Sequence, residues 1–121
     1  MMRHKNRYIT LVGFKKLSGP QVFDIGTIIK LAKEPKNKYD TEAIYVEVRH
    51  VGKAAYVANS VYTVVKGTMS GGRLYDKFDE ETFAEIRFMK DDVIIAKLLS
   101  DNKINQLKKD PESDIFYLMG E

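Results

Sequence analysis

The chain has 121 residues, a formal net charge of +3 and no cysteine. A chain of this length can bury a core as one domain, and the missing thiols exclude disulfides and thiolate metal sites. Its apolar runs are too short to span a membrane, and Lys15 and Lys16 interrupt the first of them too early for a signal peptide, so we expect a cytoplasmic protein.

The hydrophobic pattern predicts mostly short strands. In residues 43–49, Ile44, Val46 and Val48 alternate with polar neighbours, a period of two that marks a half-buried strand. After a turn at residues 50–53 the chain is expected to return as a partner strand at 54–57. Further strands are expected at residues 8–14, 25–33, 83–89 and 93–99, the last two joined as a hairpin across Lys90-Asp91-Asp92.

Two helices are expected between and after these strands. Asn59-Ser60 offers a polar N-cap and Gly67 a stop, which predicts a short helix between them, followed by a loop at residues 69–73. Residues 102–109 form a second predicted helix, and a break at residues 110–114 precedes a predicted terminal strand at 115–119. We therefore expect a mainly β fold: a small, partly open β-barrel of about six strands with one or two short helices. The barrel domain would occupy residues 1–100, and residues 101–121 would form a C-terminal extension packing on it.

The charges are unevenly distributed along the chain. Residues 1–38 carry nine Lys or Arg against two Asp or Glu, a net charge of +7, whereas residues 76–92 carry three against seven, a net charge of −4. Such an asymmetry suggests one face that attracts a polyanion and another that repels it. A solvated surface whose signs merely happen to segregate is the alternative.

One loop between two predicted strands offers an amide, an aromatic ring and a carboxylate together. Pro35 ends the first strand because proline lacks the N–H that a sheet requires, and Asn37 and Asp40 can bond nearby backbone amides to hold a short loop. Tyr39 lies between them. Such a trio could contact a nucleotide. Its sequence frame is Glu-Pro-x-Asn-x-Tyr-Asp-x-x-Ala-Ile-x-Val over residues 34–46.

This frame resembles the signature of the HIRAN domain, a module known from the front of helicase-like DNA-repair ATPases. Weaker matches at residues 11–19 and 54–59 extend the resemblance to about residues 8–90. The resemblance implies a barrel related in shape to the OB-fold. It also implies a ligand, because HIRAN domains with a known ligand bind the free 3′ end of single-stranded DNA.

Carried over residue by residue, the resemblance gives each loop residue a role. Asp40 would accept a hydrogen bond from the 3′-hydroxyl, Tyr39 would stack on the end nucleotide, and Asn37 would bond its sugar or phosphate. Lys15 matches a basic position near the DNA backbone. Lys16 departs from the family, which has a stacking aromatic there.

Other residues complete this expected nucleic-acid site. Tyr56 and Asn59 align with family positions that touch the strand, although with different residue types. Tyr56 or Phe78 could replace the aromatic ring missing at Lys16. Amides after Asn59 could receive a phosphate if a helix begins there.

The chemistry of these side chains agrees with the implied roles. An ionised carboxylate only accepts hydrogen bonds, so it suits a hydroxyl and repels a phosphate, and a tyrosine ring can stack on any base. Each residue also has a simpler alternative. Asn37 and Asp40 could only cap turns, Tyr39 could only cover the barrel mouth, and Lys15 and Lys16 could be ordinary solvated lysines.

No set of residues predicts catalysis, a cofactor or a metal site. We therefore expect a non-enzymatic, stand-alone module that binds single-stranded DNA at 3′-hydroxyl ends during DNA repair or replication-fork processing, with a separate helicase or nuclease as a partner. The main alternative is a protein-interaction or homo-oligomeric module that keeps the barrel without the DNA site. A metal-dependent nuclease using Asp40 is a third. The sequence leaves open the oligomeric state and the choice between DNA and RNA.

Overall fold

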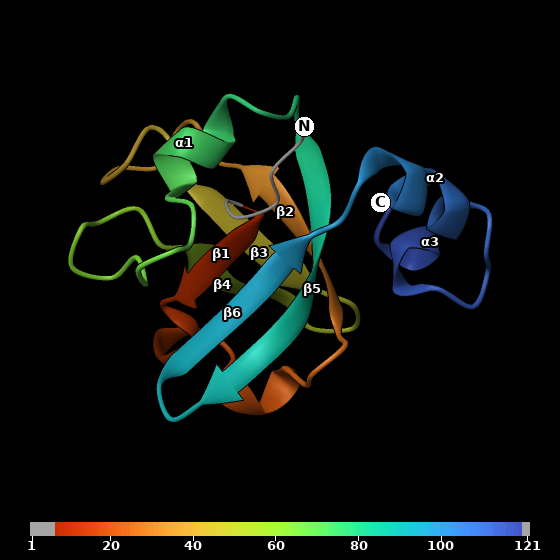
Figure 1. Ribbon diagram of the computed structural model, residues 1–121, viewed down its shortest axis with the longest axis horizontal. Coiled ribbons are helices and arrows are strands. Elements are labelled where there is room, and N and C mark those ends of the chain that lie inside the picture. The colour runs from red at the N-terminus through yellow and green to blue at the C-terminus, as the bar shows by residue number, and fades with distance from the viewer. Residues whose placement is uncertain (1–6, 120–121) are drawn as a thin grey trace.

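Six antiparallel strands close on themselves into a small β-barrel in the computed structural model, which describes residues 7–119 (Figure 1). The strand order is β1-β4-β3-β2-β5-β6, and β6 pairs again with β1. The prediction of a mainly β fold with a small barrel of about six strands is confirmed, and the barrel is closed. The strands are β1 (Tyr8–Val12), β2 (Ile28–Lys33), β3 (Ile44–Val48), β4 (Gly52–Val57), β5 (Glu81–Lys90) and β6 (Val93–Leu98).

The strand interiors follow the predicted alternation. In β3, Ile44, Val46 and Val48 are buried, whereas Tyr45 and Glu47 are only half-buried. The barrel core is filled by such inward-facing residues together with Phe14 and Phe23, which meet edge to face. The inner side of the barrel is thus a packed apolar core.

The hairpin turns place non-glycine residues in the left-handed region. Asp91, with φ of 54°, lies in the predicted turn between β5 and β6, and His50, with φ of 71°, lies in the turn between β3 and β4. Register shifts occur between Val46 and Glu47 and between Ile86 and Phe88. Such bulges bend and twist strands, which helps a sheet of six to close.

The strand pairing brings the end of β2, the start of β3 and the end of β4 together at one end of the barrel. Lys33 at the end of β2 pairs with Ile44 at the start of β3, and Tyr45 pairs with Tyr56 near the end of β4. The loop from residue 34 to 43 and the segment that follows β4 therefore leave the barrel side by side (Figure 1). This end carries most of the predicted site.

The helix predicted between Asn59 and Gly67 is wrong. Ser60 instead organises a turn: its hydroxyl accepts from the backbone N–H of Tyr62, and its carbonyl accepts from Thr63 and Val64. Side-chain bonds of this kind compete with helix formation, and valines add little helix propensity. Helix α1 (Gly71–Tyr75) forms in the predicted loop, where the Ser70 hydroxyl accepts from the backbone N–H of Arg73.

The C-terminal segment forms two helices. Helix α2 (Asp101–Lys108) confirms the helix predicted at residues 102–109, but the terminal strand predicted at residues 115–119 is wrong, because helix α3 (Asp114–Leu118) lies there. The Ser113 hydroxyl caps α3 by accepting from Phe116, and Ile115 and Leu118, three residues apart, share one buried face.

Both helices pack against the outside of the barrel through a second apolar cluster. Its buried members are Phe83, Ile104, Ile115 and Leu118. Because the barrel is closed, it offers no free edge for a further strand, and a helix buries these apolar residues against it instead.

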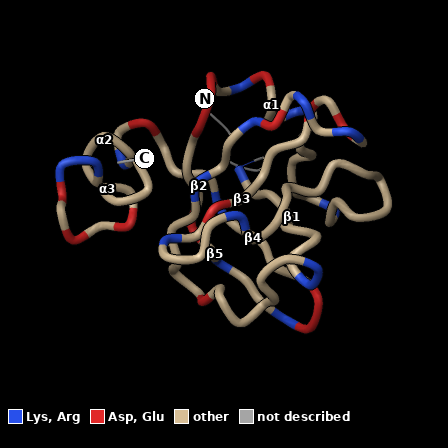
Figure 2. The backbone as a smooth tube through the Cα atoms, turned by 180° about the vertical axis from the view of Figure 1, so that it is seen from behind, with Lys and Arg blue, Asp and Glu red and all other residues tan. Residues whose placement is uncertain are grey.

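The basic and acidic segments lie interleaved. Strand β2 pairs with β5, so Lys30 reaches Glu81 at 3.4 Å and Glu47 at 3.3 Å, and it also donates to the carbonyl of Leu118. Lys15 pairs with Asp92 at 2.7 Å. Figure 2 shows that blue (Lys, Arg) and red (Asp, Glu) segments both occur within the barrel. The two segments therefore meet in ion pairs at Lys30 and Lys15, and a separation of their remaining charges into two faces stays a prediction.

None of the helices within residues 7–119 is long and apolar enough to cross a membrane.

Candidate functional site

Asn37 holds the shape of the loop between β2 and β3. Its Oδ1 accepts from the backbone N–H groups of Tyr39 at 2.9 Å and Asp40 at 3.0 Å, while its Nδ2 donates to Glu34 at 2.7 Å. Both ends of the amide are thus used inside the loop. Asn37 thus caps the turn, which was the simpler role considered for it, and these bonds hold Tyr39 and Asp40 in place.

Asp40 joins three segments that are distant in sequence. Its Oδ1 accepts from the N–H of Glu42 and its Oδ2 from Nδ2 of Asn59, each at 2.9 Å, and Asn59 in turn accepts from the N–H of Gly72 at 2.7 Å. The carboxylate still has acceptor capacity, because its two oxygens offer about four lone-pair sites. The network fixes its position before any ligand arrives.

Gly72 allows this network to form. A Cβ at this position would lie 2.8 Å from Oε1 of Glu42 and 3.0 Å from Oδ1 of Asn59. Gly71 and Gly72 begin helix α1 beside the site, where the sequence predicted a loop.

These residues surround a hollow of about 660 Å³ at the barrel end. Asn37, Tyr39 and Asp40 line it from one loop, and Asn59, Ser60 and Thr63 line it from the segment after β4. Val12, Ala43, Tyr56 and Val57 complete the lining. Tyr39 is 92% exposed, so its side chain is available to a ligand and does not cover the core.

Glu34 and Lys53, for which the sequence predicted no role, support the base of the loop. Glu34 accepts from Asn37, from the Tyr56 hydroxyl at 2.8 Å and from the Lys53 ammonium, with which it forms an ion pair. Burial alone would raise the pKa of Glu34, but the hydrogen bonds from Lys53, Asn37 and Tyr56 outweigh it, so its pKa lies below the ordinary value. The sequence signal for the supporting role of Glu34 is its position as an acidic residue directly before Pro35.

Protonation of Glu34 should loosen the loop. Because its pKa is lowered in the folded state, its contribution to stability is complete above the ordinary value of 4.5 and is lost as the pH falls through the lower, folded value. Glu34→Gln should reduce the free energy of unfolding by about 1 kcal/mol near pH 7, after allowance for solvent screening, and by much less at strongly acid pH. Denaturant unfolding across pH measures both.

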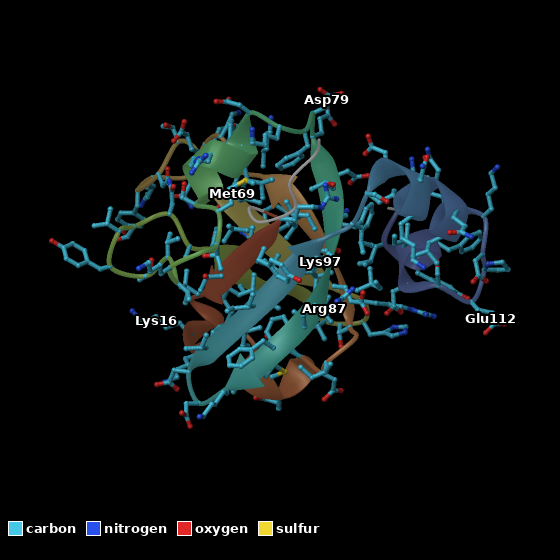
Figure 3. The ribbon with its side chains drawn as sticks, in the orientation of Figure 1. Lys16, Met69, Asp79, Arg87, Lys97 and Glu112 are labelled. Carbon is cyan, nitrogen blue, oxygen red and sulfur yellow. The ribbon has the colours of Figure 1, made fainter. Side chains whose placement is uncertain are left out.

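Glu112→Gln is the matched control for this test. Glu112 is exposed on the connection between α2 and α3, away from the barrel end (Figure 3). Its replacement should leave the stability unchanged at every pH. A Glu34→Gln protein as stable as the native one at neutral pH would contradict the supporting role of Glu34.

Lys15 and Lys16 are not part of the lining of the hollow. Both lie on the one-turn 3-10 helix η1 (Phe14–Lys16), where Lys15 pairs with Asp92 of the β5–β6 turn. Lys16 points outward from the body of the protein (Figure 3). The structure thus brings together Asn37, Tyr39, Asp40, Tyr56 and Asn59, but neither lysine lines the hollow.

The two rings considered as replacements for an aromatic at Lys16 differ in location. Tyr56 lines the hollow and donates its hydroxyl to Glu34; burial and this bond raise its pKa. Phe78 packs against the barrel core below Lys33 and borders a different hollow, next to α2. Phe78 therefore lies outside the site. Ser60 and Thr63, which the sequence placed in a helix, are site residues that it missed.

Residues 7–119 contain no group of three or more His, Asp and Glu side chains close enough to hold a metal ion.

Comparison with known proteins supports the fold. A solved structure of a protein from Lactobacillus plantarum, a structural genomics target, superposes with a TM-score of 0.55 at 20% sequence identity, over 76% of this chain and 88% of that chain. At this identity the likeness shows the fold alone. No protein-family model and no curated protein matches the sequence. A functional hypothesis must therefore come from the site.

Proposed function

We propose that this chain is a HIRAN-like module that binds single-stranded DNA in the hollow at the barrel end, with the 3′-terminal nucleotide at Tyr39 and Asp40. One observation carries the proposal: a fully exposed tyrosine ring and a pre-positioned carboxylate with spare acceptor capacity border the same hollow. The ring offers a face to any base, and the carboxylate accepts from a hydroxyl and repels a phosphate. The module would therefore distinguish a 3′ end from an internal linkage without reading its sequence.

The supports of the site favour a binding role over a purely structural loop. Asn37 and Asn59 hold Asp40, while Gly72 holds Asn59 and Glu34 holds Asn37, so the Asp40 carboxylate loses little freedom on binding. No catalytic step is included in the proposal. A separate helicase or nuclease would act on the captured end in DNA repair or replication-fork processing.

A binding titration at several salt concentrations tests the proposal. Lys36 and Lys38 flank Asn37 in the site loop, and Lys16 on η1 follows Val12 of the lining by four residues, so two or three phosphate contacts are expected. Each contact with a single strand should contribute about 0.7 to the slope of log affinity against log salt, which gives about −1.4 to −2.1 in all. Fluorescence anisotropy of a short 5′-labelled oligonucleotide with a 3′-hydroxyl measures this slope.

Two double variants with the same charge change locate the contacts. Lys36→Gln with Lys38→Gln should lower the slope, whereas Lys103→Gln with Lys109→Gln, around the distant helix α2, should leave it unchanged. Equal effects of the two double variants would indicate a general attraction and contradict the assigned site. No detectable binding by the native protein at about 50 mM salt would sink the proposal as a whole.

A second candidate function is a protein-interaction or homo-oligomeric module. The observation that favours it is that Asn37 and Asp40 already have turn-capping partners, while Lys16 stands where the family has a stacking ring. In that case the titration would show no binding, and light scattering of the purified protein would reveal whether it self-associates.

A further inference from the structure

A second exposed tyrosine lies on the other loop that borders the hollow. Tyr62 is 93% exposed and its neighbour Val61 is 87% exposed, and Tyr62 and Tyr39 are the most exposed large apolar or aromatic side chains within residues 7–119. Tyr62 lies between Ser60 and Thr63, both of which line the hollow, but its own ring is not part of the lining.

The backbone that carries Tyr62 is held in place. The Ser60 hydroxyl accepts from the Tyr62 N–H at 3.1 Å, and the Ser60 carbonyl accepts from Thr63 and Val64. The two ends of the loop are tied to β1, because Ala58 donates to the carbonyl of Thr10 and Val65 donates to its hydroxyl. A ring on such a turn can be contacted at a small cost in chain entropy.

The surroundings of this ring are compatible with a nucleic-acid strand. Residues 58–70 contain no Asp or Glu and a single Lys, Lys66, so no negative charge on this loop opposes a phosphate. The loop projects from the same side of the barrel as the loop of Tyr39 (the yellow-green and orange loops at the left of Figure 1). The hydrogen bond between Asp40 and Asn59 joins the two loops at their base.

We infer that Tyr62 is a second stacking position, which holds the base next to the terminal nucleotide where the strand leaves the hollow over the Ser60–Thr63 rim. This inference rests on the proposed function. A strand whose last nucleotide occupies the hollow must continue past one of its rims, and this rim presents a neutral aromatic ring with apolar Val61 beside it. Stacking there is tolerant of sequence, because every base has a π-face.

The test combines protein variants with oligonucleotides that lack one base. Labelled oligothymidylates with a 3′-hydroxyl are prepared intact, or with an abasic nucleotide at the last, penultimate or fourth position from the 3′ end. Tyr62→Ala should weaken binding of the intact strand about five-fold or more. Removing the penultimate base should weaken binding to the native protein by a similar factor and to Tyr62→Ala hardly at all, whereas Tyr62→Phe should bind like the native protein.

Control variants separate this inference from the proposed function. Phe116→Ala removes a half-exposed ring from α3 and should not change binding, and thermal denaturation should show that Tyr62→Ala is as stable as the native protein. Weakened binding by Tyr39→Ala together with native binding by Tyr62→Ala would overturn the inference and leave the proposed function standing. A Tyr62→Ala loss that is the same whichever base is missing would also overturn it. Failure of the native protein to bind any of these strands would overturn both.

Discussion

An oligonucleotide with a 3′-phosphate should bind this protein far more weakly than the same strand with a 3′-hydroxyl. A 3′-deoxy end would lose only the hydrogen bond to Asp40, a charge-assisted contact worth about 1.5–3 kcal/mol, or roughly 10- to 150-fold in affinity. The phosphate should be worse still, because two anions would then face each other at short range. Competition titrations with three strands that differ only at the 3′ end measure the series.

Varying the 3′ end of the oligonucleotide tests Asp40 more directly than a substitution of Asp40 does, because the protein and its hydrogen bonds stay the same. A strand with a 5′-phosphate is the control, and it should bind like the unmodified strand. Equal affinity for the 3′-hydroxyl and 3′-phosphate ends would contradict end recognition by Asp40 and leave only a non-specific basic surface.

A protein variant can still isolate the charge of Asp40 if the network is kept. Asp40→Asn alone would set its amide against Nδ2 of Asn59, which is already a donor in that contact. Combining it with Asn59→Asp reverses the bond, and the new carboxylate can still accept from the N–H of Gly72. In this double variant a neutral acceptor stands at position 40 and the charge moves to position 59, so the part of the difference between hydroxyl and deoxy ends that is due to position 40 should fall to about 0.5–1.5 kcal/mol.

Phe83→Ala should destabilise the protein by about 3–5 kcal/mol. Phe83 lies in β5, is 2% exposed and anchors the cluster in which α2 and α3 pack on the barrel. Its removal would leave a cavity beside Ile104 and Ile115 that the closed barrel cannot collapse to fill. The midpoint of denaturant unfolding, measured together with its slope, gives the change.

Phe88→Ala on the same strand is the matched control. Phe88 is 45% exposed, so its loss should cost much less than that of Phe83. Neither variant lies in the lining of the hollow, and both should bind DNA normally under conditions where they are folded. Equal destabilisation by the two variants would show that the C-terminal helices do not form a core with β5.

The strands were largely predictable because their information is local. The alternation of Ile44, Val46 and Val48 marked β3, and the charged pair Asp91-Asp92 marked the turn between β5 and β6. The predictions failed where local preferences were weak. The valines after Ser60 fit a helix or a turn about equally well. Hydrogen bonds from the Tyr62 N–H to the Ser60 hydroxyl and from the Val65 N–H to the hydroxyl of distant Thr10 favour the turn. The short apolar run at residues 115–118 fits both the two-residue period of a strand and the 3.6-residue period of a helix. Because the closed barrel has no free edge for another strand, the run packs as a helix on the outside of the barrel.

The same division holds for the candidate site. The sequence by itself determined that Asn37, Tyr39 and Asp40 share one loop, because residues so close together between two strands cannot separate. Only the tertiary structure decided which distant residues join them: strand pairing and loop packing bring Glu34 to Tyr56 and Asp40 to Asn59, while Lys15 is drawn to Asp92. Hydrogen bonds between segments depend on register and barrel closure, which no local pattern encodes. Contacts distant in sequence also hold the loop of exposed Tyr62, whose two ends are tied to Thr10 of β1.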